Sequence, residues 1–220
     1  ADGSPFMNTD ELVAFLATGV EPVAASATDR RHAVALAGGG VGAMSLMLVL
    51  LGVRGDLLAA MHLPMFWVKL ALPVGIALGV LTAAKRLARP GVVLGWLPAA
   101  LLLAPVVGIG LLAALALSAA APEARLALLL GRTWAVCPLL IALLSLPVFA
   151  GTFWAMNGLA PTRPALAGAA AGLLAGAVAT AIYALHCPEM AAPFLATWYL
   201  VGMAIPTAVG ALLGPRLLRW

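Results

Sequence analysis

The clearest indication of the fold class is the stretch VVLGWLPAALLLAPVVGIGLLAALALS, residues 92–118. It contains no charged residue and is apolar on every side of a helix, whereas a surface helix of a soluble protein pairs an apolar face with a polar one. A helix that crosses a bilayer needs about 20 such residues. A β-barrel would show short alternating segments instead. The stretch therefore predicts a transmembrane helix.

Five further runs share this character and are separated by polar or Pro/Gly-rich breaks. The chain of 220 residues is 64% hydrophobic and 9% charged, with a mean hydropathy of +1.11. A soluble domain carries about 25% charged residues, so this chain has too little polar surface to face water. We therefore predict an all-α, polytopic membrane protein, a bundle of six transmembrane helices with little room for a soluble catalytic domain. The expected spans are 33–53, 64–84, 92–118, 134–156, 165–185 and 192–213.

The segment before the first span divides into two parts. Residues 1–6, ADGSPF, are interpreted as a cloning remnant in front of a natural start at Met7. Residues 7–32 form a short tail that lacks the basic start of a signal peptide. The six-helix domain then occupies residues 33–220.

The basic residues indicate how the bundle is oriented. Eight of the twelve lie on the side of the N-terminus, and cytoplasmic segments carry the excess of Lys and Arg. We therefore expect both termini in the cytoplasm, and topology explains the net charge of +4 better than nucleic-acid binding does. The inner set is Arg30, Arg31, Lys85, Arg86, Arg89, Arg163, Arg216 and Arg219, and the outer set is Arg54, Lys69, Arg125 and Arg132.

Small residues and prolines indicate how the helices pack. Glycines at four-residue spacing allow helix backbones to approach closely in lipid. Prolines inside spans are expected to kink them. The glycine pairs and triplet are Gly38 with Gly42, Gly75 with Gly79, and Gly168 with Gly172 and Gly176; the prolines are Pro73, Pro105, Pro147 and Pro206.

Motifs of known chemistry are missing from the sequence. It has no P-loop, no HExxH, no CxxC and no GxSxG. The middle of the six runs holds no Asp, Glu, His or Arg, which counts against an ion-coupled transporter. Lys69 lies near an expected outer helix end, where its side chain can snorkel to the interface. We therefore expect a protein that is not an enzyme.

The tail contains a short amphipathic pattern in NTDELVAFLATGVE, residues 8–21. Thr9 is the expected N-cap, Asp10 and Glu11 suit the first turn, and Gly19 is the expected stop. A helix that rests on anionic lipid is normally basic, but this one is acidic. It suits a basic protein partner better, although a helix lying on the membrane is the plain alternative. Its apolar face is formed by Leu12, Phe15, Leu16 and Val20.

Soft side chains gather in the expected outer loops. Cys137 and Cys187 each precede a proline, and a disulfide between them is allowed in an oxidising compartment. The pair has three interpretations: small apolar packing residues, a redox-active pair, or ligands of a soft or borderline metal. No spacing matches a known metal motif. The candidate metal ligands are Cys137, Cys187, His186, Met190, Met61, His62 and Met65.

Together these segments resemble the NrsF-type family of integral-membrane anti-sigma factors. The resemblance covers nearly the whole chain after Met7. It is carried by the acidic start, by six helices, and by the segments TWAVCPLLIALLSLP (133–147), PTRPALAGAAAGLLAG (161–176), HCPE (186–189) and LLGPRLLRW (212–220).

The resemblance implies a negative regulator of an extracytoplasmic-function sigma factor in the bacterial inner membrane. It implies that the tail, through Asp10, Glu11, Leu12, Phe15 and Leu16, holds the sigma factor. It also implies that Cys137 and Cys187 sense an oxidant or a thiol-reactive heavy metal. Expected partners are the sigma factor and membrane lipid, with a second copy of the chain as a further candidate and without direct nucleic-acid contact.

No cofactor is expected, apart from a soft metal ion acting as the signal. A small-solute transporter or channel is the main alternative, and it predicts a polar pore. A membrane enzyme of thiol or quinone chemistry is the second alternative, and it predicts a bound cofactor.

Overall fold

The computed structural model describes residues 8–18, 27–87, 95–157, 161 and 163–218. Every regular element in these residues is a helix. Six helices are long and apolar enough to cross a membrane, by length and composition. The predicted fold class is therefore confirmed.

The helices are α1 (Thr9–Ala17), α2 (Ala27–Leu50), α3 (Leu57–Met61), α4 (Pro64–Leu87), α5 (Trp96–Ala119), α6 (Pro122–Leu130), α7 (Cys137–Met156), α8 (Pro164–Tyr183), α9 (Ala192–Phe194), the π-helical turn η1 (Leu195–Tyr199) and α10 (Leu200–Leu217).

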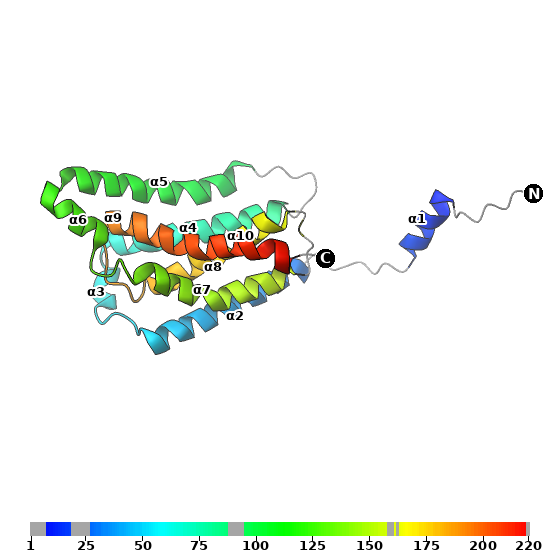
Figure 1. Cartoon of the computed structure of the whole chain (residues 1–220), viewed down its shortest axis with the longest axis horizontal. Coiled ribbons are helices and arrows are strands. Elements are labelled where there is room, and N and C mark those ends of the chain that lie inside the picture. Colours follow the sequence, from blue (N-terminus) through cyan, green and yellow to red (C-terminus); the bar gives the residue numbers. More distant parts are fainter. Residues whose placement is uncertain (1–7, 19–26, 88–94, 158–160, 162, 219–220) are drawn as a thin grey trace, which may run out of the picture.

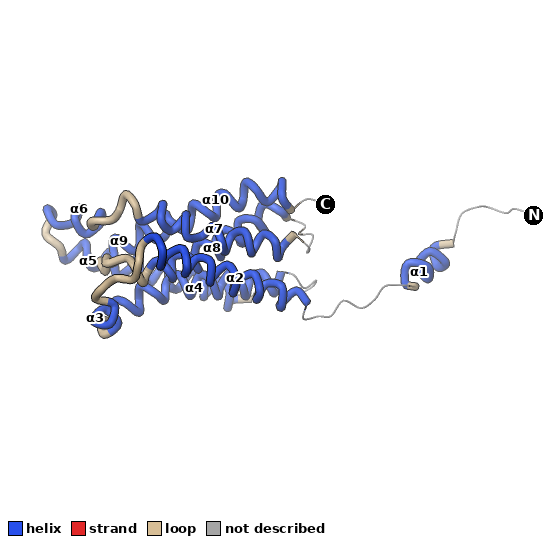
Figure 2. The backbone as a smooth tube through the Cα atoms, turned by 90° about the horizontal axis from the view of Figure 1, so that it is seen from below, coloured by secondary structure: helices blue, strands red, loops and turns tan. Residues whose placement is uncertain are grey.

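The long helices run side by side along one axis (Figure 1). Helix α8 is the most buried of them and packs against α10, α7 and α4. Helix α5 lies along one edge against α4 and α9, and α2 lies against α7. Viewed from below in Figure 2, the short helices α3, α6 and α9 gather at the end opposite the C-terminus. We call this the α3/α6 end.

Helix boundaries differ from the prediction at several points. Helix α2 starts six residues before the predicted span 33–53 and stops at Leu50, because Gly52 adopts a positive φ of 71°. Helices α3 and α6 were not predicted, since each is shorter than a span. The last span is interrupted by η1, a local feature that hydropathy cannot reveal. The region before Trp96 in the predicted span 92–118 lies largely outside the described residues, as do residues 1–6.

Glycines bring helix backbones into direct contact, as predicted, with one correction. A Cβ on Gly172 or Gly168 would collide with the backbone of α10, and one on Gly79 would collide with Leu102 of α5. In α2, however, the contact face holds Gly39 and not Gly38. A Cβ on Gly39 would lie 2.6 Å from the Cα of Val148, whereas one on Gly38 would meet nothing within 4 Å. The four-residue spacing therefore identified Gly42 correctly but chose the wrong companion.

Three of the four predicted prolines pack onto glycines of a neighbouring helix. The ring of Pro147 faces Gly42, that of Pro105 faces Gly75, and that of Pro206 faces Gly176. A Cβ on each of these glycines would come within 2.9 Å of the proline ring. The missing side chain therefore makes room for the ring, and each pair joins two helices.

Candidate functional site

The two predicted sensing cysteines lie together at the α3/α6 end. Cys137 begins α7, and its N–H donates to the carbonyl of Thr133 at 2.9 Å. Cys187 follows α8, and its N–H donates to the carbonyl of Tyr183 at 3.0 Å. Both are free thiols with 0% exposure. We name residues 131–136 the Cys137 turn and residues 185–191 the Cys187 strap.

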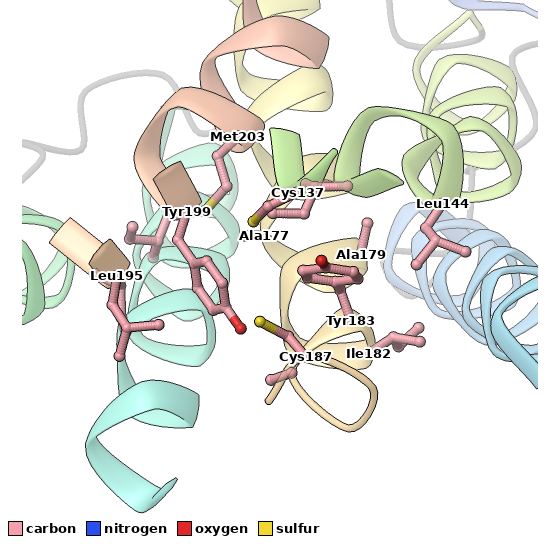
Figure 3. Packing of buried hydrophobic residues seen from close by; sticks show 14 of the residues in the cluster. Cys137, Leu144, Ala177, Ala179, Ile182, Tyr183, Cys187, Leu195, Tyr199 and Met203 are labelled. Atoms are coloured by element: carbon pink, nitrogen blue, oxygen red, sulfur yellow. The ribbon is translucent and has the colours of Figure 1, made fainter. Parts of the chain in front are cut away.

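Two tyrosines line the same buried group (Figure 3). Tyr183 lies beside both thiols, and its ring centroid is 6.2 Å from that of Tyr199. The hydroxyl of Tyr199 points toward the sulfur of Cys187. It is buried without a hydrogen-bond partner. Tyr199 ends η1, and π-helical turns are frequent at functional sites. Sequence reasoning missed both tyrosines because apolar runs conceal them.

Lys69 corrects a prediction, because its side chain does not snorkel. It is fully buried in α4, and its ammonium donates to the carbonyl oxygens of Cys187 at 2.6 Å and Glu189 at 3.0 Å. The ammonium also lies 5.7 Å from the ring centroid of Tyr199. A buried cation inside an apolar bundle is costly and marks a functional site by default. Its position in the run 64–84 was the signal that could have identified it.

A second cation braces the Cys187 strap from outside the spans. The guanidinium of Arg54 donates to the carbonyl of Cys187 at 3.2 Å and pairs with Asp56 at 2.6 and 2.7 Å. The hydrogen bond with Arg54 lowers the pKa of the Asp56 carboxyl below its usual value. The same bond raises the pKa of Arg54. Lys69 and Arg54 therefore both fix the backbone of Cys187.

The candidate metal ligands are brought only partly together. Cys137, Cys187 and His186 share this end of the bundle, and Nδ1 of His186 lies 2.9 Å from the carbonyl oxygen of Gly52. Within the described residues, no group of three His, Cys, Asp or Glu side chains could hold a metal ion. The role of the thioethers and of His62 stays a prediction. Met61 and His62 are exposed at the end of α3, and Met65 and Met190 are half-buried.

The predicted tail helix forms, with a different cap. Asn8 and not Thr9 is the N-cap, because the Asn8 N–H donates to the carboxylate of Glu11 at 3.2 Å. Asp10 and Glu11 occupy the first turn as predicted. Leu12 is 43% exposed and Phe15 is 68% exposed. The side chain of Leu16 and residues 19–26, with Gly19 and Val20, lie outside the described part of the chain.

In Figures 1 and 2, α1 lies apart from the bundle. In these views no other described helix covers the apolar face of α1. A free apolar face on an acidic helix is suited to a groove on a basic partner.

At the end of the bundle opposite the cysteines, Arg31 connects α2 to α7. Arg31, near the start of α2, donates from Nη2 to the carbonyl of Trp154 at 2.8 Å. Its guanidinium carbon lies 4.6 Å from the centroid of the Trp154 ring. Trp154 is in the last turn of α7, the helix that begins at Cys137. One helix therefore links the cysteine group to the base of the tail.

These features are those of a polytopic α-helical protein of the membrane-spanning type, with a buried thiol pair at one end. A family model described as "Negative regulator of sigma F" matches residues 16–220. A protein of Azospira oryzae described as a probable anti-sigma-F factor is 54% identical over 214 residues, covering 97% of this chain and 100% of the relative. The anti-sigma-F factor of Caulobacter vibrioides is 40% identical over 220 residues, with coverage of 97% and 100%.

The chain therefore belongs to the NrsF family, as the resemblance predicted. The family is named for a regulatory role, which confirms the expectation of a regulator and not an enzyme. No solved structure matches this chain.

Proposed function

We propose that this chain is an anti-sigma factor of the bacterial inner membrane that sequesters an extracytoplasmic-function sigma factor and releases it on an envelope signal. Membership of the NrsF family carries this proposal, together with the two relatives that match over nearly the whole chain. The six apolar helices provide the membrane anchor. Both termini lie in the cytoplasm, in line with the bias of Lys and Arg.

The tail, residues 7–32, is the proposed sigma-binding element. Its helix α1 presents Leu12 and Phe15 to solvent beside two carboxylates, Asp10 and Glu11. An amphipathic helix binds in an apolar groove, and acidic neighbours favour a basic rim around that groove. Leu16 completes the predicted binding face.

The buried pair Cys137 and Cys187 is the proposed sensor. Two thiols in one group can form a disulfide, in which they lose two electrons and two protons to an oxidant. One molecule of hydrogen peroxide would accept the two electrons and the two protons and be reduced to two molecules of water. Two thiolates are also ligands that a soft heavy-metal ion prefers, and His186 is a neighbouring imidazole. Either event would draw the Cys137 turn and the Cys187 strap together.

The signal would then travel along α7. This helix runs from Cys137 to Trp154, which binds Arg31 near the start of α2. Helices α7 and α2 touch through Gly39, Gly42 and Gly151, so a shift of one is felt by the other. The last residues of the tail, 27–32, form the start of α2. A change at the cysteines thus has a packed route to the sigma-binding element, and it must favour one packing by a few kcal/mol.

A pull-down tests the binding function. The full chain is co-expressed with candidate sigma factors, purified in detergent, and compared with a chain lacking residues 7–30. We expect one sigma factor to be retained by the full chain and lost on truncation. Absence of any sigma factor from both samples would contradict the proposal and favour the transporter, with solute flux as the next measurement.

Two substitutions localise the binding face. The double change L12A/F15A is expected to weaken sigma binding by about tenfold or more, since each removes an apolar anchor. The matched control is A14S, at an exposed residue on the side of α1 opposite Leu12. Equal loss in both variants would contradict the assigned face.

The sensor is tested with a sigma-dependent reporter in cells. C137S and C187S chains are expected to bind the sigma factor and to leave the reporter unresponsive to peroxide and to cadmium. A C137S strain that still responds to both would overturn the cysteine sensor while leaving the anti-sigma function standing.

A further inference from the structure

Glu189 connects the two segments that carry the cysteines. Its Oε1 accepts a hydrogen bond from the backbone N–H of Arg132 at 2.7 Å, and the hydroxyl of Thr133 lies 3.5 Å away. The backbone carbonyl oxygen of Thr133 in turn accepts a hydrogen bond from the N–H of Cys137. The carboxylate therefore ties the Cys187 strap to the Cys137 turn, from the residue two places after Cys187.

The Cys137 turn is shaped to fit this carboxylate. Gly131 adopts a positive φ of 56°, and a Cβ there would lie 2.9 Å from the carboxyl carbon of Glu189 and 2.7 Å from Phe194. A side chain at this position would push the carboxylate away. The backbone conformation at Gly131 therefore makes room for the Glu189 carboxylate and allows the turn and the strap to approach closely.

Both thiols are buried next to the contact between the strap and the Cys137 turn. Cys137 and Cys187 have no exposed surface, whereas Pro188, between Cys187 and Glu189, is exposed. Outside the strap lies a hollow of about 560 Å³ lined by Arg132, Thr133, Pro188 and Glu189. A dissolved reagent can enter this hollow, where it meets the Glu189 contact; neither sulfur lines the hollow.

The far side of the strap is held from within the bundle. Lys69 donates to the carbonyls of Cys187 and Glu189, and Arg54 donates to that of Cys187. These bonds come from α4 and from the loop after α2, so the inner edge of the strap is anchored. The outer edge depends on the carboxylate of Glu189. Opening is therefore expected where the side chain of Glu189 meets the Cys137 turn. The backbone carbonyls held by Lys69 would stay in place and act as the hinge.

We propose that Glu189 is the gating residue of the cysteine pair: its carboxylate latches the Cys187 strap to the Cys137 turn and determines which reagents reach the thiols. This deepens the proposed sensor function and rests on it. With the latch closed, reaction waits for a local opening, so small reagents are favoured over bulky ones. With the latch removed, the thiols react faster and bulky reagents gain most.

Thiol labelling of the full chain tests the gate without any sigma factor. Reduced protein in detergent micelles is treated with N-ethylmaleimide or with a polyethylene-glycol maleimide, in C137S and C187S backgrounds that report each cysteine separately. E189A is expected to accelerate labelling of Cys187 by about tenfold or more, because a charge-assisted hydrogen bond is lost. The acceleration should be larger for the bulky maleimide.

Two further variants separate gating from general damage. E123Q removes a carboxylate from the exposed surface of α6 at the same end and should label at the unsubstituted rate. E189Q keeps the shape but weakens the acceptor, and should fall between the parent and E189A. If E189A does not fold, by size-exclusion profile, the E189Q rates decide the question.

Equal labelling rates in E189Q, E189A and their parent, with full reactivity after unfolding, would overturn the gate. A uniform rise for both maleimides, with a lowered unfolding midpoint, would show a merely structural role and would also overturn it. Neither result depends on sigma binding, so the failure of the gate and the failure of the anti-sigma function are distinguishable.

Discussion

At the scale of single residues, the hydroxyl of Tyr199 stands out, since it is buried, points toward the sulfur of Cys187 and makes no hydrogen bond of normal geometry. An unsatisfied buried polar group costs about 1–3 kcal/mol. We expect Y199F to be as stable as the parent chain or more stable by up to about that amount, measured as the unfolding midpoint in detergent. Y199A should instead lose about 3–5 kcal/mol through the cavity it leaves. A clear loss in Y199F would mean that the hydroxyl has a partner.

The pair Arg54–Asp56 predicts a pH dependence at the same scale. Arg54 lowers the pKa of Asp56 in the folded chain, so the unfolded chain binds a proton at that carboxyl more readily. The stabilisation is therefore present above the usual pKa of Asp, about 3.9, and is lost as the pH falls through the lowered folded value. The effect should be small, since Asp56 is largely exposed.

The measurement compares the parent chain with D56N. Unfolding midpoints in detergent should differ near neutral pH, with D56N lower, and converge in acid. A difference that does not change with pH would contradict the assignment.

At the scale of helices, adjacent glycines in α2 predict opposite outcomes. G38A adds a methyl group in open space and removes a flexible residue from a helix, so stability should hold or rise by up to about 1 kcal/mol. G39A places the methyl against the backbone of Val148 and must part α2 from α7, at a cost of about 1–3 kcal/mol.

The two variants are compared by thermal unfolding and by the sigma-dependent reporter. We expect G39A, and not G38A, to alter the response, because α2 and α7 form the proposed route. Identical stabilities would show that the α2–α7 contact is looser than described.

At the scale of the whole molecule, the six candidate spans predict that both termini lie on the same side of the membrane. The charge bias predicts that this side is the cytoplasm. A fluorescent protein fused after Trp220 should therefore fluoresce, and alkaline phosphatase fused there should be inactive. The control fusion follows Leu130, at the α3/α6 end, and should give the reverse pattern. Matching patterns at both sites would contradict the topology.

Composition and run length were enough to predict a lipid environment and the number of candidate spans. An uninterrupted apolar run such as 96–119 is stable as a helix only in lipid, so composition and length were enough to predict six helices. The acidic, amphipathic character of α1 could also be predicted from the residues of its own segment. Each of these properties is local, because it depends on residues within one segment.

Which residues contact one another became visible only in the folded chain. Lys69 looked free to snorkel, because its helix position was known but not the carbonyls of Cys187 and Glu189 that surround it. Gly39 replaced Gly38 in the helix contact, because spacing gives a face but not the neighbour that covers it. Glu189 stood out in the sequence only as the last residue of HCPE, and its contact could not be predicted, since its partner at Arg132 is 57 residues away and is a backbone N–H. Contacts between distant segments depend on how the helices pack, and the local pattern does not encode that packing.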